Sequence, residues 1–139
     1  IEALERVLTN AETSAATMNQ IAGMAAVSGP MDEVVMMKNE YKKRRDLLVS
    51  LVGEIPGMSC HMPKGAFYLF VNVKPILEKL KINCEDLADR ILREARVLIL
   101  PGTSYGSLGE GYIRFSYVSS EENIRKGCRR IKEFINKIY

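Results

Sequence analysis

The sequence predicts an α/β fold, in an α+β arrangement, in which a small mixed sheet packs against helices. Three observations support this fold class. Apolar residues recur at helical spacing in several stretches. Short runs of β-branched and aromatic residues lie between the later helices. With 139 residues, 47% of them hydrophobic, the chain is long enough to form one hydrophobic core. Helices and strands mixed in this way most simply form a sheet that helices cover.

The first part of the sequence is predicted to be helical. Residues 1–10 form a short amphipathic helix that begins without a capping residue, which suggests a piece of a larger protein. After a break at 11–14, a helix over 17–27 consists largely of small residues and methionine, so we expect it to be buried or at an interface. Ser28-Gly29-Pro30 ends this helix and marks the one plausible domain boundary. The boundary separates a helical segment, 1–28, from a domain over 29–139.

Strands and helices share the rest of the chain. A long helix is expected over 31–53, and strands over 58–61, 66–73, 97–100 and 112–118. The strand over 97–100 is continuously apolar, as in strands that are buried on both faces. Asn83 and Asp86 can begin a further helix, and Ser119 with Glu122 makes a capping box before the last one. The buried side of the helix after Asn83 is predicted to consist of Leu87, Ala88, Ile91, Leu92 and Ala95.

Composition argues against several functional classes. The net charge of +3 is too small to indicate a nucleic-acid partner or an acidic membrane surface. There is no apolar stretch of membrane-spanning length and no signal-peptide pattern. Cys60, Cys84 and Cys128 are widely spaced and His61 is the single histidine, which favours reduced thiols over disulfides or a zinc site. Reduced thiols indicate a cytoplasmic protein.

Three further patterns have structural interpretations. The basic run 42–45 lies on an amphipathic helix without a second basic cluster, which favours a solvated face over RNA binding. Cys60 and His61 are adjacent in a predicted strand and point to opposite faces, which disfavours a nucleophilic Cys–His pair. The methionines are interpreted as adaptable core packing, namely Met18, Met24, Met31, Met36, Met37, Met58 and Met62.

Arg114 is the strongest candidate for a binding residue. Strand alternation places Arg114 on one face with Tyr112 and Ser116. The other face is apolar and comprises Ile113, Phe115 and Tyr117. A partly buried arginine needs an anion, and its planar fork suits a carboxylate. Spacing alone favours a salt bridge within the domain over a bound ligand.

A glycine-rich loop over 101–111 comes directly before the strand that carries Arg114. It is not a P-loop, because no Gly-Lys-Ser/Thr sequence closes it and a strand follows. A surface connection and a binding loop both fit the residues, since long loops are often lids or ligand-binding segments.

Three motifs resemble the class I/II aminotransferases of pyridoxal-phosphate (PLP) fold type I. Residues 62–70, MPKGAFYLF, resemble the family's P-x-G-A-F-Y strand. Residues 97–106, VLILPGTSYG, resemble its V-x-x-x-P-G-x-x-F-G segment. Residues 111–117, GYIRFSY, followed by EENI, resemble its G-x-x-R-[FL]-S-[YF] ending. The motifs occur in family order, and the resemblance covers essentially the whole chain.

The resemblance implies the C-terminal small domain of such an enzyme, which transfers an amino group between an L-amino acid and a 2-oxo acid. Arg114 matches the arginine that holds the substrate α-carboxylate, and Phe67 matches an aromatic position on the substrate side. The loop 102–111 would lie near the cleft between the two domains, with Tyr105 where phenylalanine is commoner. The segment 1–28 would join from the large PLP-binding domain, and the intact protein would be a homodimer.

Other family features have no match in these residues. They include the Ser-x-x-Lys motif of the Schiff-base lysine, the aspartate that pairs with the pyridinium nitrogen, and the phosphate-binding groups. We therefore expect no catalytic, cofactor-binding or metal-binding residue here, and no activity from this chain alone. The alternative is a free-standing, non-catalytic αβ module that binds a small anion or a protein partner.

Overall fold

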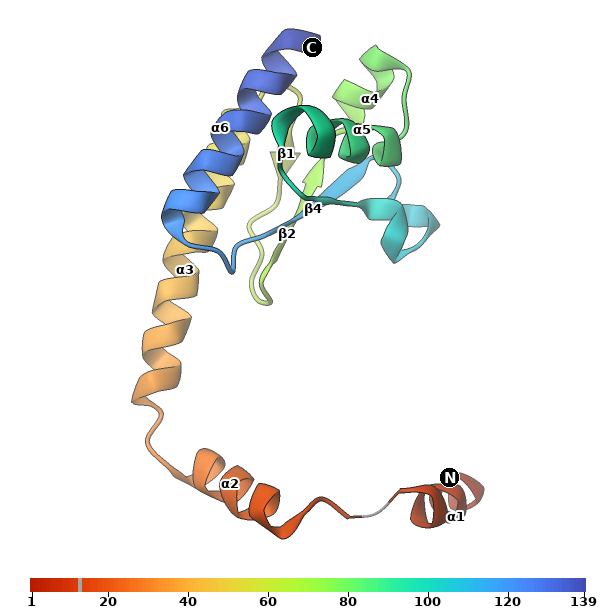
Figure 1. Cartoon of the computed structure of the whole chain (residues 1–139), viewed down its shortest axis with the longest axis vertical. Helices are drawn as coiled ribbons and strands as arrows, with labels where there is room; N and C mark the ends of the chain where they lie inside the picture. Colours follow the sequence, from red (N-terminus) through yellow and green to blue (C-terminus); the bar gives the residue numbers. More distant parts are fainter. Residues whose placement is uncertain (13) are drawn as a thin grey trace. The chain divides into compact units, whose positions relative to one another are not determined.

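The structure is a computed structural model that describes residues 1–12 and 14–139. Its elements are α1 (Glu2–Ala11), α2 (Thr17–Ser28), α3 (Asp32–Gly53), β1 (Ser59–Cys60), β2 (Tyr68–Asn72), α4 (Lys74–Leu80), α5 (Cys84–Arg90), the π-helical turn η1 (Ile91–Ala95), β3 (Leu100–Pro101), the 3₁₀ turns η2 (Gly102–Tyr105) and η3 (Ser107–Gly109), β4 (Tyr112–Ser116) and α6 (Glu121–Ile138) (Figure 1). The chain divides into two compact units, Ile1–Met36 and Met37–Tyr139. Thr13, in the predicted break at 11–14, lies outside the described residues.

The unit Ile1–Met36 contains the two predicted N-terminal helices, α1 and α2. Side chains of α2 that we expected to be covered are exposed: Met18, Ile21, Met24 and Val27. Burial of this helix within the chain is therefore wrong for the described residues, and its place at an interface stays a prediction. The interpretation of the methionines as core packing is also wrong for six of the seven, since only Met58 belongs to the core. The domain boundary after residue 28 also stays a prediction.

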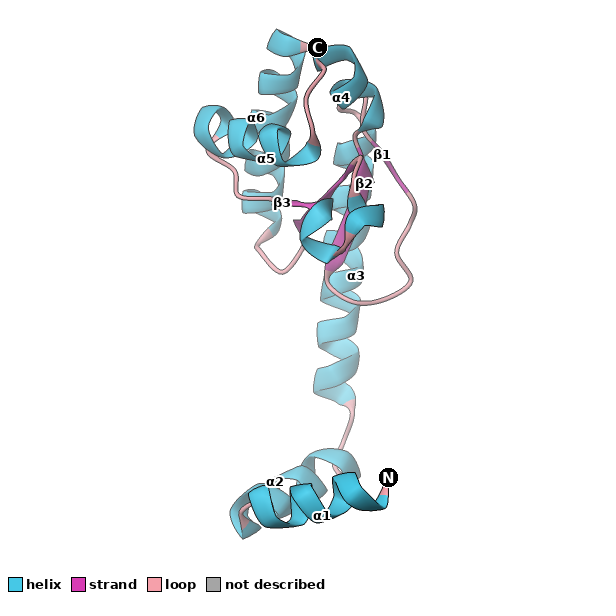
Figure 2. Ribbon diagram, turned by 90° about the vertical axis from the view of Figure 1, so that its right-hand side faces the viewer, coloured by secondary structure: helices cyan, strands magenta, loops and turns pink. Residues whose placement is uncertain are grey.

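The unit Met37–Tyr139 is built on a four-stranded sheet with the strand order β1-β2-β4-β3 (Figure 2). Every strand pair is antiparallel, whereas we expected a mixed sheet. The predicted class, a small sheet packed against helices, is confirmed. β2 and β4 form the centre, where Leu69 lies opposite Phe115 and Val71 lies opposite Ile113.

One face of the sheet joins a hydrophobic core with the helices. Leu69, Val71, Ile113 and Phe115 are buried on this face. The helices contribute buried residues that include Leu48, Val52, Ile76, Leu87, Ile91, Ile124, Ile131 and Ile135. α6 runs beside the second half of α3 (Figure 1), and the Lys132 ammonium contacts the Glu54 carboxylate at 2.9 Å.

The structure differs from the local expectations at four places. The helix α4 is present although the sequence patterns did not predict it. Leu92 lies at the edge of the predicted buried side and is exposed, whereas Ile91 and Ala95 of the π-helical turn are buried. The strand over 97–100 is reduced to Leu100–Pro101, and Leu98 is 73% exposed.

The fourth correction concerns the start of α6, where the N-cap is Ser120. The Ser120 hydroxyl oxygen accepts from the Asn123 N–H at 3.3 Å. The carbonyl of Ser119 instead accepts from the Arg44 guanidinium, which fixes the loop before the helix. The predicted cap on the helix α5 is confirmed, since Asn83 accepts from the Asp86 N–H at 2.8 Å.

Candidate functional site

The face of the sheet opposite the core carries the Arg114 side chain. In the β2–β4 register, Phe70 lies directly opposite Arg114 and Tyr68 directly opposite Ser116. Directly opposed residues of an antiparallel pair share a face, so these four side chains lie on one surface. The burial of β4 alternates as predicted, with Ile113 and Phe115 buried and Arg114 half-buried. We call this surface the open face.

The Arg114 guanidinium lies over two tyrosine rings. Its central carbon is 4.1 Å from the centroid of the Tyr68 ring and 4.8 Å from that of the Tyr105 ring. Among residues 1–12 and 14–139, Arg114 forms no ion pair with an Asp or Glu side chain. The salt bridge that spacing favoured is therefore absent from this part of the chain. The cation is held by aromatic faces instead.

Further aromatic rings extend the open face. Phe70 stacks on Tyr112 with a centroid distance of 5.1 Å and an interplanar angle of 13°. Phe70 also meets the Tyr105 ring edge-on at 6.4 Å. The Lys74 ammonium lies 5.4 Å from the Tyr112 centroid and adds a second positive charge. The open face thus combines aromatic surface with cations.

The loop 101–111 is folded into the 3₁₀ turns η2 and η3 and is fastened to α5. One Glu110 carboxylate oxygen accepts from the Cys84 N–H at 3.0 Å, and the other accepts from the Cys84 thiol at 3.3 Å. The Thr103 hydroxyl donates to the Glu85 carboxylate at 2.8 Å. A Cβ at Gly102 or Gly109 would overlap the backbone of the other residue, so the two chain segments pack backbone to backbone.

Phe67 lies in the turn just before β2, and its ring packs against Tyr41 of α3 with centroids 4.8 Å apart. Ala66 has a left-handed φ of 60°, which is uncommon for a residue with a side chain. The Tyr117 hydroxyl donates to the Ala66 carbonyl at 2.7 Å and holds this turn. Burial raises the pKa of the Tyr117 phenol, while the Arg45 charge works in the opposite direction. Phe67 is not among the rings that contact Arg114.

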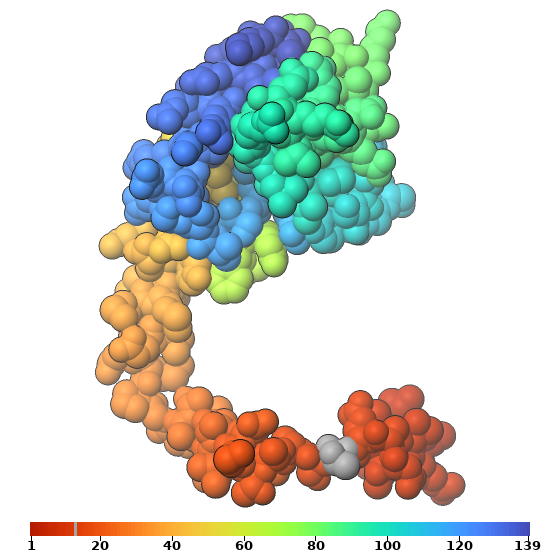
Figure 3. Space-filling model, in the orientation of Figure 1, coloured from red at the N-terminus to blue at the C-terminus, as the bar shows by residue number. Residues whose placement is uncertain are grey.

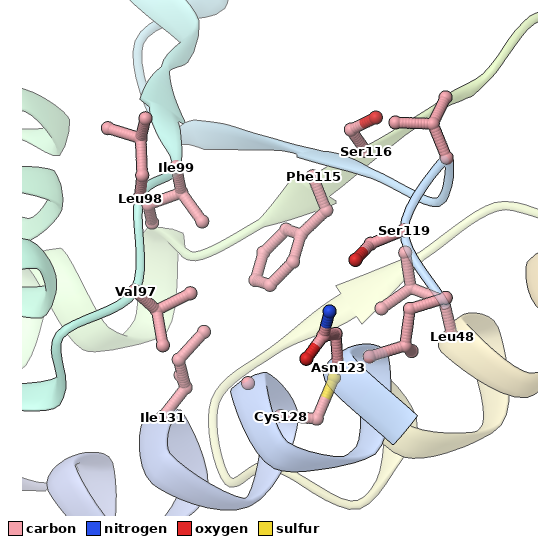
Figure 4. A pocket seen from close by; sticks show the side chains of 13 residues that line it. Leu48, Val97, Leu98, Ile99, Phe115, Ser116, Ser119, Asn123, Cys128 and Ile131 are labelled. Carbon is pink, nitrogen blue, oxygen red and sulfur yellow. The ribbon is translucent and has the colours of Figure 1, made fainter. Parts of the chain in front are cut away.

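A separate hollow of about 300 Å³ lies on the other side of the sheet, beside α6. It opens between the blue surface around the start of α6 and the green surface near residue 97 (Figure 3). Uncharged residues line it, and the Phe115 ring points into it (Figure 4). Burial, helped by the Glu54 charge, raises the pKa of the Cys128 thiol in its wall to about 11. The hollow therefore offers neither a cation for an anionic ligand nor a reactive thiolate.

The described residues contain no group of three or more His, Cys, Asp or Glu side chains placed to hold a metal ion. Within the same residues, no helix has the length and apolarity that a membrane crossing requires. The basic run 42–45 is partly structural, because Arg44 donates to the carbonyls of Val118 and Ser119, and Arg45 donates to that of Pro63.

Sequence reasoning identified Arg114 but missed its partners. The sequence shows Tyr68 only as part of a family-like motif, and Tyr105 only as a tyrosine where phenylalanine is commoner, so neither is predicted to contact Arg114. The available signal was strand alternation in 66–73, which puts Tyr68 and Phe70 on one face. Glu110 gave no local signal, because its partner Cys84 is 26 residues away in sequence.

Comparison with known proteins identifies the family. The model of the family described as aminotransferase class I and II matches residues 1–131. The chain is 37% identical over 120 residues to an aspartate aminotransferase of Pyrococcus horikoshii, covering 85% of this chain and 30% of that protein. It is 36% identical over 138 residues to a (5-formylfuran-3-yl)methyl phosphate transaminase of Methanocaldococcus jannaschii, covering 99% and 35%.

A solved aspartate aminotransferase from Rhizobium meliloti superposes on 99% of this chain and 36% of its own, with a TM-score of 0.86 and 26% identity. The chain spans about a third of the length of the curated relatives it matches. The family model and the similarity to solved aminotransferases point to the same family. The chain belongs to the class I and II aminotransferase family.

Proposed function

We propose that this chain supplies the substrate-carboxylate side of a PLP-dependent aminotransferase site, and that Arg114 binds the α-carboxylate. The L-amino acid and the 2-oxo acid that exchange the amino group both carry this carboxylate. The observation that supports the proposal is the Arg114 guanidinium on the open face, close to the rings of Tyr68 and Tyr105 and with no carboxylate partner in the described residues. Family membership favours an enzyme over the non-catalytic module that the sequence left open.

Arginine suits this role for two reasons. Its planar fork can donate two parallel hydrogen bonds to a carboxylate, which fixes the orientation of the substrate as well as its position. The guanidinium also stays protonated at any physiological pH, so the charge on the site does not depend on pH. The neighbouring aromatic rings exclude water from the faces of the guanidinium, which strengthens its attraction for an anion.

The family generally depends on PLP, which supplies an electron sink for the substrate carbanion. Holding PLP takes a lysine for an imine, a carboxylate for the pyridinium nitrogen and an anion site for the phosphate. The open face does not fit this set. Lys74 lies over Tyr112, and the Glu110 carboxylate is engaged by Cys84. We therefore assign no step of PLP chemistry to these residues.

The proposal extends to the intact protein. The groups that hold PLP would belong to the part of the enzyme not represented in these 139 residues, and this chain alone would be inactive. The segment 1–28 would join the small domain, 29–139, to the large domain. Phe67 would line the substrate side of the site, and the enzyme would act as a cytoplasmic homodimer. These features are supported by the family resemblance.

The test is mutation of Arg114 in the full-length enzyme. Arg114→Ala should lower kcat/KM for amino acids by about 100-fold or more, because the substrate charge loses its partner. Arg114→Lys should lower it less, by roughly tenfold, since a single ammonium keeps the charge and loses the bidentate geometry. PLP content, measured by visible absorbance, should not change. Arg130→Ala, at an exposed position on α6, is the matched control. Near-normal kcat/KM in Arg114→Ala would refute the assignment.

A further inference from the structure

We propose that Tyr68 and Tyr105 are positioning residues for Arg114, and that Glu110 sets the position of Tyr105 by fastening its loop to α5. This inference rests on the proposed role of Arg114 and adds to it a mechanism that keeps the guanidinium ready for a carboxylate. It concerns three side chains that do not have to touch the substrate themselves.

The contacts with two aromatic rings hold Arg114 without using its hydrogen-bond donors. The centre of the guanidinium lies over the Tyr68 ring at 4.1 Å and over the Tyr105 ring at 4.8 Å. Aromatic rings attract the flat face of a guanidinium, whereas its N–H bonds point outward in the plane. An Asp or Glu partner would occupy those donors. Two rings therefore orient the group and leave its fork available for a ligand.

The two tyrosines are held in different ways. Tyr68 is the first residue of β2, where it forms the end pair of the β2–β4 ladder with Ser116, so its backbone is held by the sheet. Tyr105 ends the 3₁₀ turn η2 and has no strand partner. The edge-on contact with Phe70 at 6.4 Å supports the Tyr105 ring from one side only. The position of Tyr105 therefore depends on what holds the loop.

Glu110 attaches the second half of that loop to α5. Both of its carboxylate oxygens are engaged by Cys84, through the backbone N–H at 3.0 Å and the thiol at 3.3 Å. Cys84 is fully buried at the start of α5 and belongs to the core, so the attachment point is rigid. A carboxylate is also favoured there because the N–H groups of the first helical turn lack partners within the helix. At the other end of the loop, the Thr103 hydroxyl donates to Glu85 at 2.8 Å.

This arrangement predicts a hierarchy of effects. Loss of the Tyr105 ring should let the guanidinium turn, which weakens carboxylate binding more than it slows the chemistry. A cation–π contact of this kind corresponds to a change in affinity of roughly twofold to thirtyfold. Loss of the Glu110 carboxylate should have the same effect indirectly, because the loop then moves with Tyr105 on it.

The experiment compares variants of the full-length enzyme in steady-state kinetics, with acetate as a competitive inhibitor that reports on the carboxylate subsite. Tyr105→Leu and Tyr68→Leu should each raise the amino-acid KM and the acetate inhibition constant roughly twofold to thirtyfold, with a smaller change in kcat. Tyr105→Phe, which keeps the ring, should stay within about twofold. Glu133→Gln, at an exposed position on α6, is the control for the loss of an acidic charge.

Glu110 is tested through its coupling to Tyr105. Glu110→Ala should raise the same two constants, and the double variant with Tyr105→Leu should be no worse than Tyr105→Leu alone. Glu110→Gln keeps an acceptor for the Cys84 N–H, so its amino-acid KM and acetate inhibition constant should lie between those of wild type and Glu110→Ala. This variant tests the role of Glu110 even if the alanine variant folds poorly. Effects that simply multiply in the double variant would overturn the link between Glu110 and Tyr105.

The outcomes also separate this inference from the proposed function. Unchanged constants in Tyr105→Leu and Tyr68→Leu, together with a large loss in Arg114→Ala, would overturn the positioning roles and leave the role of Arg114 intact. Normal acetate inhibition in Arg114→Ala would overturn the proposed function itself.

Discussion

Phe70 of β2 lies directly opposite Arg114 of β4. This register decides which side chains surround the guanidinium, because it brings Tyr68 and Phe70 onto the same face as Arg114. A slip of the register by one residue would move Leu69 and Val71 to the open face and bury the tyrosine. The hydrophobic core on the other face prevents such a slip, so core packing and the candidate site are specified together.

The turn before β2 gives a first prediction, about backbone strain. Ala66 has a φ of 60°, and a β-branched side chain is disfavoured there. Ala66→Val should destabilise the chain by about 1–2 kcal/mol. Ala66→Gly should be close to neutral, since relief of the strain offsets the added freedom of the unfolded chain. Urea unfolding of the two variants checks this. Equal stabilities would show that the turn does not require the left-handed conformation.

The contact between Gly102 and Gly109 gives a second prediction. A methyl group at Gly109 would overlap the Gly102 backbone, so the two segments of the loop would have to separate. Gly109→Ala should lower the free energy of unfolding by about 1–3 kcal/mol. Gly53→Ala is the matched control, since a Cβ there meets no atom within 4 Å. Thermal melting of both variants measures the difference, and a neutral Gly109→Ala would contradict the close packing.

The start of α6 gives a third prediction, which separates two adjacent serines. The Ser120 hydroxyl oxygen accepts from the Asn123 N–H, whereas Ser119 takes part through its backbone carbonyl. Ser120→Ala should therefore cost about 1 kcal/mol of stability, and Ser119→Ala should cost close to nothing. Chemical denaturation of the pair is the measurement. The reverse order would restore the capping box predicted from the sequence.

Cys128 gives a fourth prediction, on pH dependence. Burial is the first cause and the Glu54 charge the second in raising the pKa of this thiol from 9.0 to about 11. The unfolded chain therefore loses the thiol proton at a lower pH than the folded chain does. The corresponding stability is fully present below pH 9 and is lost as the pH rises toward 11.

The variant Cys128→Ala isolates this effect, because it removes the titrating group. The wild-type chain should lose about 2 kcal/mol more stability than the variant between pH 8 and pH 11. Urea unfolding at the two pH values measures the difference. Parallel losses in both proteins would mean that the thiol is not protected by burial.

Sequence patterns predicted the features that depend on local periodicity. The alternation of Ile113, Arg114 and Phe115 is a two-residue repeat, and the structure confirms it. The cap at Asn83 is also local, because the donor lies three residues away. The family resemblance pointed to Arg114 through a motif in the same strand.

Features that depend on distant contacts were missed. The placement of Tyr68 over Arg114 requires the pairing of two strands whose facing residues lie 40 to 48 positions apart. Leu92 lies at the edge of the apolar stripe that helical spacing defines, and the packing of distant elements decides that it is exposed. The salt bridge that spacing alone favoured for Arg114 is absent from residues 1–12 and 14–139, where aromatic faces, which spacing does not reveal, supply its contacts.

Recognition of the α-carboxylate by Arg114 is tested with two ligands that differ only in that group. The ratio of dissociation constants for an L-amino acid substrate and for the primary amine that lacks its carboxylate should be measured in full-length wild type and Arg114→Ala. Wild type should prefer the amino acid strongly, and the preference should fall by about 100-fold in the variant. An unchanged ratio in Arg114→Ala would show that Arg114 does not bind this carboxylate.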